Sequence, residues 1–247
     1  MSGHSKWHNI QRRKGKQDAV RGQLFTKLSR DVYLAAKEGG GNPDTNFRLK
    51  VAIERAKQSN LPADNIARTI AKATGSLEGV TYEEIQYEGY APHGVAVLID
   101  IVTDNRNRTA ADVRHIFKKR GGNLAESGAV AWMFTRTGQI SVERARVADA
   151  ETFMLEVIEA GADDVEESDD AFLITTSVEA FRSVRTAIES MGVEYEDAEL
   201  TYVPSTTVEV AGEAADDVFN LIEALEAHDD VQTVYYNAVT PDDEEGA

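Results

Sequence analysis

The stretch that decides the fold is residues 94–109, which read GVAVLIDIVTDNRNRT. The first ten residues are mostly aliphatic and β-branched, a composition typical of a buried strand. Residues 85–90 predict a second strand, which joins the first across the turn-forming segment 91–94.

The polar end of this stretch predicts the beginning of a helix. Thr109 and Asp112 have the spacing of a capping box, and the apolar periodicity continues until Gly121-Gly122 ends the helix. A further strand is expected at 130–134. Strands and a helix packed together predict an α+β domain at the centre of the chain.

Three amphipathic helices are predicted on the N-terminal side, at 17–38, 45–59 and 62–75. Brief loops with Gly and Pro separate them, which is typical of a small helical bundle. The first helix has cations opposite its apolar side: Lys16, Lys27, Arg30 and Lys37. That side is predicted to be a basic surface.

Helices and strands alternate on the C-terminal side. Helices are expected at 150–160, 179–191 and 214–227, and strands at 139–143, 171–176, 199–203, 206–210 and 231–236. The acidic run 163–170 is interpreted as a solvated turn. Residues 139–204 thus contain a β-α-β-α-β set, whereas 76–138 lacks a second helix and a last strand that 206–238 would supply.

We therefore expect an α+β protein with a three-helix N-terminal domain followed by two α/β-sandwich domains of the split βαβ, ferredoxin-like kind. The predicted regions are a basic helical domain with an N-terminal arm at 1–75, a discontinuous domain at 76–138 plus 205–240, an acidic inserted domain at 139–204, and a disordered tail at 241–247.

Charge is distributed unevenly along the chain. The 247 residues carry a formal charge of −17, yet residues 1–75 hold 15 Lys and Arg against 6 Asp and Glu. Residues 76–138 are near neutral, and residues 139–247 hold 4 basic against 29 acidic residues. A basic head on an acidic body can bind a polyanion while the body is repelled from it.

The sequence favours the cytoplasm as the place of action. It contains no cysteine, so its stability must come from packing, which a reducing compartment allows. No apolar run follows the basic N-terminus, and we expect neither a signal peptide nor a membrane span.

Catalysis finds no support in the motifs. There is no Gly-x-Gly-x-x-Gly, no phosphate-binding Gly-x4-Gly-Lys-Ser/Thr and no Gly-x-Ser-x-Gly, and the five histidines are scattered. His4 and His8 are at best half a zinc site without cysteine or a carboxylate nearby. We predict a protein that is not an enzyme and has no cofactor or metal.

Nucleic acid fits the charge pattern better. The arm offers five cations that could neutralise phosphates: Lys6, Arg12, Arg13, Lys14 and Lys16. Trp7 could stack on an exposed base, which is worth ~1–3 kcal/mol, or could pack against the bundle. Lys27 and Arg30 would extend this surface. Arg106 and Arg108 lie at a predicted helix N-terminus, which favours an anion but is equally typical of a capped, solvated turn.

Several segments together resemble the YebC/PmpR family, to which the mitochondrial translational activators belong. They are Gly3-His4-Ser5-Lys6-Trp7, Arg13-Lys14, Gln17-Asp18, Arg21-Gly22, Phe25-Thr26-Lys27, Glu88-Gly89-Tyr90, Thr103-Asp104-Asn105-Arg106-Asn107-Arg108-Thr109 and Gly121-Gly122. The resemblance covers nearly the whole chain. His8, Ala91 and His93 depart from residues common in the family.

The resemblance implies three domains and a non-enzymatic role. Members are described as DNA-binding transcriptional regulators, and others as ribosome-associated factors that help translation through difficult sequences such as proline runs. We therefore predict a nucleic-acid-binding regulator of transcription. The alternative is a ribosome-associated translational activator that binds ribosomal RNA, with a basic protein as partner of the acidic domain.

Overall fold

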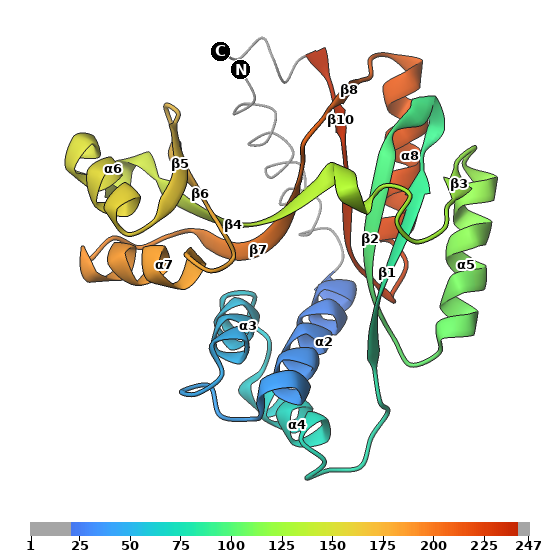
Figure 1. Cartoon of the computed structure of the whole chain (residues 1–247). Coiled ribbons are helices and arrows are strands. Elements are labelled where there is room, and N and C mark those ends of the chain that lie inside the picture. The colour runs from blue at the N-terminus through green and yellow to red at the C-terminus, as the bar shows by residue number, and fades with distance from the viewer. Residues whose placement is uncertain (1–20, 242–247) are drawn as a thin grey trace. The chain divides into compact units, whose positions relative to one another are not determined.

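The computed structural model describes residues 21–241 (Figure 1). They form two compact units: one contains 132–207, and the other contains 21–131 together with 208–241. The predicted α+β class, with helices first and sheets after them, is confirmed.

The larger unit begins with three helices, α2 (Arg21–Gly39), α3 (Phe47–Gln58) and α4 (Ala63–Ala73). Their shared core contains Leu28, Val32, Ala36, Leu49, Ala52, Ala56 and Ile66. Buried Asn46 joins the first two helices: its side chain accepts from Leu49 N and donates to Ala35 O at 2.7 Å. A side-chain cap of this kind satisfies N–H groups that a helix start leaves open.

The same unit continues as a four-stranded antiparallel sheet in the order β3-β1-β2-β9. Its strands are β1 (Glu83–Tyr90), β2 (Ala96–Thr103), β3 (Asn123–Leu124) and β9 (Val231–Tyr236). A tight 3-10 turn, η1 (Pro92–Gly94), joins the first two strands, with His93 and Gly94 at positive φ. β9 therefore brings the C-terminal part of the chain against β2, which is the strand that the sequence predicts most clearly.

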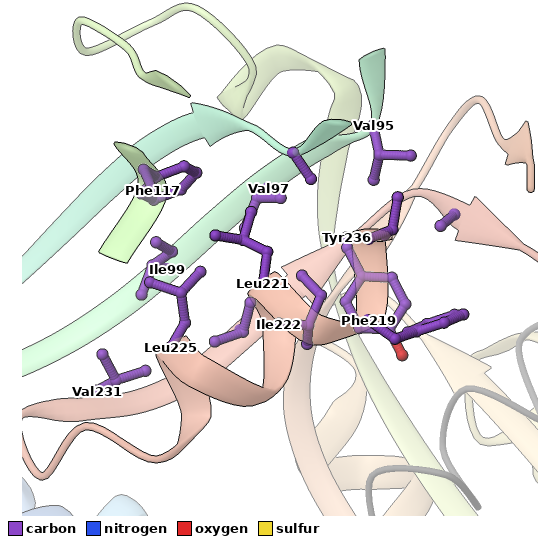
Figure 2. Packing of buried hydrophobic residues seen from close by; sticks show 14 of the residues in the cluster. Val95, Val97, Ile99, Phe117, Phe219, Leu221, Ile222, Leu225, Val231 and Tyr236 are labelled. Carbon is purple, nitrogen blue, oxygen red and sulfur yellow. The ribbon is translucent and has the colours of Figure 1, made fainter. Parts of the chain in front are cut away.

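Two helices cover one face of this sheet, α5 (Arg106–Lys119) and α8 (Glu213–Glu226). Figure 2 shows Val97 and Ile99 of β2 packed among Phe117 of α5 and Leu221 and Leu225 of α8. All five side chains are fully buried. The short strands β8 (Val208–Glu209) and β10 (Ala238–Val239) pair in parallel beside this layer. The element order, β-β-α-β-α-β, differs from the split βαβ order because β1 and β2 form a hairpin.

The smaller unit is a four-stranded sheet in the order β5-β6-β4-β7. Its elements are β4 (Phe134–Glu143), η3 (Arg144–Arg146), α6 (Ala150–Glu159), β5 (Ala162–Glu167), β6 (Ala171–Thr176), α7 (Phe181–Ser190) and β7 (Asp197–Pro204). The order β-α-β-β-α-β is that of a split βαβ sandwich. Figure 1 shows both helices on the same side of this sheet.

Three local expectations were wrong. The N-cap of α5 is Asn105, whose side chain accepts from Arg108 N at 3.1 Å, and Thr109 is buried within the first turn. The acidic run from 163 is largely strand β5, because pairing with β6 outweighs its low strand propensity. Trp132 lies in the turn η2 (Ala131–Met133), not in a strand, and is 71% exposed.

Candidate nucleic-acid interface

The predicted contact residues fall into two groups. Six of them lie outside the described residues: Lys6, Trp7, Arg12, Arg13, Lys14 and Lys16. The structure places the other four, Lys27, Arg30, Arg106 and Arg108, and it gives three of them partners within the larger unit.

Lys27 and Arg30 lie against the C-terminal end of α8. Lys27 Nζ donates to Glu226 O at 2.9 Å, and Arg30 donates to Asp229 O and, at 3.0 Å, to Asp230 Oδ1. The last carbonyl groups of a helix lack intrahelical partners and carry the negative end of its dipole. Lys27 therefore stabilises this helix end, and Arg30 binds the loop that follows it, so both cations hold α2 against the sheet layer.

Burial changes the chemistry of Lys27. Removal from water lowers the pKa of its ammonium group, although the nearby carboxylates of Glu226 and Asp229 oppose that shift. Gln23 and Gln232 add hydrogen bonds on either side, to Ala227 O and Lys27 O. This side of α2 is polar because it packs on polar groups, and its basic residues are an internal contact of the unit.

Asp230 is the centre of the contact. Its buried carboxylate accepts from Thr109 Oγ1 at 2.6 Å, from Arg108 Nη2 at 2.8 Å and from Thr103 Oγ1 at 3.2 Å, in addition to Arg30. Burial alone would raise the pKa of Asp230. The hydrogen bonds from Thr109 and Arg108 and the charge of Arg30 outweigh burial and hold that pKa below its ordinary value.

The segment 103–109 thus stabilises the fold through its hydrogen bonds to Asp230. Arg108 bridges Asp230 and, at 2.8 Å, Asp104, and hydrogen bonds to these carboxylates raise its pKa. Arg106 is exposed and has no hydrogen-bond or ion-pair partner among residues 21–241. Of the two arginines predicted to bind an anion here, Arg106 is the one whose charge is unpaired.

Glu88 stabilises the loop that contains residues 128–131. Its buried carboxylate accepts from the backbone N–H groups of Gly128, Val130 and Ala131 at 2.6–2.8 Å. Burial raises the pKa of Glu88, but these three hydrogen bonds lower it below the ordinary value. The next residue, Gly89, has no room for a side chain, since a Cβ would lie 2.7 Å from the Phe117 ring.

Four exposed cations on α5 and directly after it escaped the sequence prediction: Arg114, Lys118, Lys119 and Arg120. The helix and the residue after it carry six basic side chains against Asp112: Arg106, Arg108, Arg114, Lys118, Lys119 and Arg120. All six are exposed, and within the described part of the chain only Arg108 has a partner. The 7 basic and 8 acidic residues of 76–138 sum to a net charge of −1, which hides this cluster, whereas a count over the length of one helix finds it.

The helical region also presents unpaired cations. Lys50 and Lys57 of α3 and Arg68 and Lys72 of α4 are exposed and have no partner among the described residues. Arg48 differs, since it pairs with Glu38 and, at 3.6 Å, with Glu84. These four cations without described partners therefore lie on α3 and α4, whereas Lys27 and Arg30 on the polar side of α2 have partners within the unit.

Comparison with known proteins decides the family. Residues 5–76 match the model of the TACO1/YebC protein N-terminal domain, and residues 82–238 match that of the TACO1/YebC second and third domain. The chain belongs to the TACO1/YebC family. Its motifs at the start of the chain, at 88–90 and at 103–109 are therefore features of a TACO1/YebC protein.

Relatives extend over the whole length of this TACO1/YebC chain. It is similar to proteins named "probable transcriptional regulatory protein" from Clostridium tetani, 51% identical over 100% of both chains, and from Dictyoglomus turgidum, 50% identical over 98% of both. The crystal structure of a conserved hypothetical protein from Aquifex aeolicus has a TM-score of 0.82 at 46% identity, covering 92% of this chain and 93% of that one. The names of the relatives from Clostridium tetani and Dictyoglomus turgidum are those of transcriptional regulators.

Two further features are absent from the described part of this TACO1/YebC protein, a metal-binding cluster and a membrane-spanning helix. Residues 21–241 hold no group of three or more His, Asp or Glu placed to bind a metal ion. Among the same residues, none of the helices has the length and apolar character that crossing a membrane requires.

Proposed function

We propose that this TACO1/YebC protein is a non-enzymatic regulator of gene expression that binds DNA in transcription control and acts in the cytoplasm without a cofactor. The observation that carries the proposal is the separation of charge. Residues 1–75 hold 15 basic against 6 acidic residues, whereas the unit 132–207 holds 5 against 17. A polyanion would be attracted to the first region and repelled by the second.

The proposed contacts are of two kinds. Lys6, Arg12, Arg13, Lys14 and Lys16 of the N-terminal arm would neutralise phosphates, and Trp7 would stack on a base. The exposed cations of α3 and α4 would extend that surface: Lys50, Lys57, Arg68 and Lys72. The names of the relatives in Clostridium and Dictyoglomus support transcription as the process.

The test compares the full chain with a chain that lacks residues 2–16. Fluorescence anisotropy with a labelled DNA duplex, over a range of salt concentrations, measures the affinity and its salt dependence. Removing five phosphate contacts should reduce the slope of log K against log salt by about 4. The melting temperature reports the fold and should stay within about 2 °C. Unchanged DNA binding by the shortened chain would rule out the arm as the contact.

A second candidate function is a ribosome-associated translational activator. The observation that favours it lies on α6, where Leu155 and Ile158 are 58% and 53% exposed. Glu151, Glu156 and Glu159 are exposed beside them. An apolar and acidic helix face suits a basic protein partner, and proteins that bind ribosomal RNA are of that kind.

Crosslinking in cells distinguishes the two functions. Sequencing both the DNA and the RNA that crosslink to the protein identifies the polymer directly. Enrichment of genomic DNA supports the transcription proposal. Enrichment of ribosomal RNA, together with sedimentation of the protein with ribosomal particles at low salt, would replace it by the translation proposal.

A further inference from the structure

We infer that the exposed face of α5 is a second phosphate-binding surface, which contacts the sugar–phosphate backbone of the nucleic acid that the N-terminal region binds. The inference rests on the proposed function and deepens it. The face is defined by Arg114 and Lys118, and Arg106, Lys119 and Arg120 extend it at the two ends of the helix. None of these five cations has a partner in the described chain.

The density of charge on this face is high for so acidic a protein. Residues 106–120 hold six basic side chains and one acidic side chain, and Asp112 faces His228 Nε2 at 3.4 Å. Arg108 is engaged by Asp104 and Asp230. The remaining five cations are not neutralised within the described unit, so they are available to an external anion.

The position of the face on the helix separates it from acidic neighbours. Asp112 and Ile116 lie on the side of α5 toward α8, as the contact of Asp112 with His228 at the end of α8 shows. At 100° per residue, Arg114 lies about 160° around the helix from Asp112. Arg114 and Lys118 therefore point away from α8, whose first turn holds Glu213 and Asp216.

The helix is held rigidly, so its cations are preorganised. Val113 and Phe117 are fully buried against the sheet, as Figure 2 shows for Phe117, and Asn105 caps the N-terminus. Gly122, directly after the helix, allows close packing, because a Cβ there would lie 2.7 Å from Tyr90 O. Binding through this face therefore orders only side chains, which limits the entropic penalty of association.

The length of the face fits a nucleic-acid backbone. From Arg106 to Arg120 the rise is about 20 Å, over which a duplex carries about twelve phosphate charges. Apart from the His115 ring, the exposed side chains of α5 include no aromatic residue that could stack on a base. The chemistry is therefore that of backbone contacts, which fix position and add affinity without reading sequence.

The test uses the full chain with Arg114→Gln and Lys118→Gln together. The matched control is Arg136→Gln with Arg182→Gln, which removes two charges from exposed positions in the unit 132–207. Anisotropy titrations over a range of salt use three probes of one sequence: a DNA duplex, an RNA duplex and a DNA single strand. The α5 variant should bind at least one probe about tenfold more weakly, with a slope of log K against log salt reduced by about 2.

Each outcome has a defined meaning. Weaker binding and a smaller slope for the α5 variant, with an unchanged control and an unchanged melting temperature, support the inference, and the affected probe identifies the polymer. Equal behaviour of the α5 variant and the control overturns the inference while the proposed function stands. A wild-type chain that binds none of the three probes overturns the proposed function, and the inference with it.

Discussion

At the scale of single residues, conserving the charge of Asp230 matters for stability. Four side-chain donors surround its carboxylate, those of Arg30, Thr103, Arg108 and Thr109, and two of them are cations. A buried carboxylate is stable only when such donors compensate its loss of hydration. The same donors would face an uncharged group if the carboxylate were replaced by an amide.

We predict that Asp230→Asn destabilises the larger unit by about 3 kcal/mol, because it leaves the partly buried guanidinium group of Arg30 and the exposed one of Arg108 without their shared anion. Urea denaturation followed by circular dichroism measures the free energy of unfolding. Asp112→Asn is the control, since Asp112 is exposed and its contact with His228 is long. Its effect should stay within about 0.5 kcal/mol. Equal effects of the two substitutions would contradict the central role of Asp230.

Stability should also fall in acid. The pKa of Glu88 and of Asp230 is lower in the folded chain than the ordinary values of 4.5 and 3.8. A depressed pKa stabilises the fold fully above the ordinary value, and the stabilisation is lost as pH falls toward the folded pKa. The free energy of unfolding should therefore be nearly constant between about pH 7 and 5.5, and decline below about pH 4.5.

The variant Glu88→Gln tests the origin of that decline. It removes the charge that three backbone N–H groups stabilise, so the fold should lose about 2 kcal/mol at pH 7. Its stability should then fall less steeply than wild type between pH 4.5 and 3, because one titrating group is missing. A parallel decline in wild type and variant would assign the acid sensitivity to other carboxylates.

At the scale of elements, the sequence predicts helices and strands well where periodicity is strong. The strands at 85–90 and 94–103 and the helices at 150–160 and 214–227 lie within a few residues of β1, β2, α6 and α8. Residue propensities predicted the acidic run wrongly because strand pairing decides its structure. Asp164 and Glu166 belong to β5, where they pair with Thr175 and Leu173 of β6. The basic side of α2 was predicted to be a free surface, but it packs on the end of α8. A helical wheel shows that one side of a helix is polar, but it does not show which groups of the fold pack against that side.

A glycine in β1 gives a test of element packing. Gly89→Ala would place a Cβ 2.7 Å from the Phe117 ring and 2.8 Å from Asn123 O. The substitution should destabilise the sheet layer by about 1–3 kcal/mol, because strand and helix cannot separate without losing contacts. Thermal melting of the variant and of wild type measures this loss of stability. The matched control, Gly22→Ala in α2, meets nothing within 4 Å and should be neutral or slightly stabilising.

At the scale of the whole molecule, the candidate site is less predictable than the fold. Motifs identify the family, but a motif does not say whether a residue binds a ligand or supports the structure. Arg108 and Glu88 lie in the most specific motifs, and their hydrogen bonds support the structure. Most of the cations of α5 that have no described partner lie outside those motifs. Whether residues 139–204 form an independent domain stays a prediction.

One experiment can separate basic residues that stabilise the fold from basic residues that bind nucleic acid. Lys27→Gln with Arg30→Gln removes charges that the end of α8 and Asp230 already engage. We expect a loss of stability of about 2 kcal/mol and a salt slope of nucleic-acid binding within about 0.5 of wild type. Lys50→Gln with Lys57→Gln removes the same charge from exposed positions without partners in the described chain.

For that second pair the proposed function predicts the reverse pattern. Stability should change by no more than about 0.5 kcal/mol, since neither side chain has an internal contact to lose. The slope of log K against log salt should fall by about 2, one unit for each phosphate contact removed. If the Lys27 and Arg30 variant instead loses slope while keeping its stability, these two residues bind nucleic acid, and their contacts with α8 are secondary.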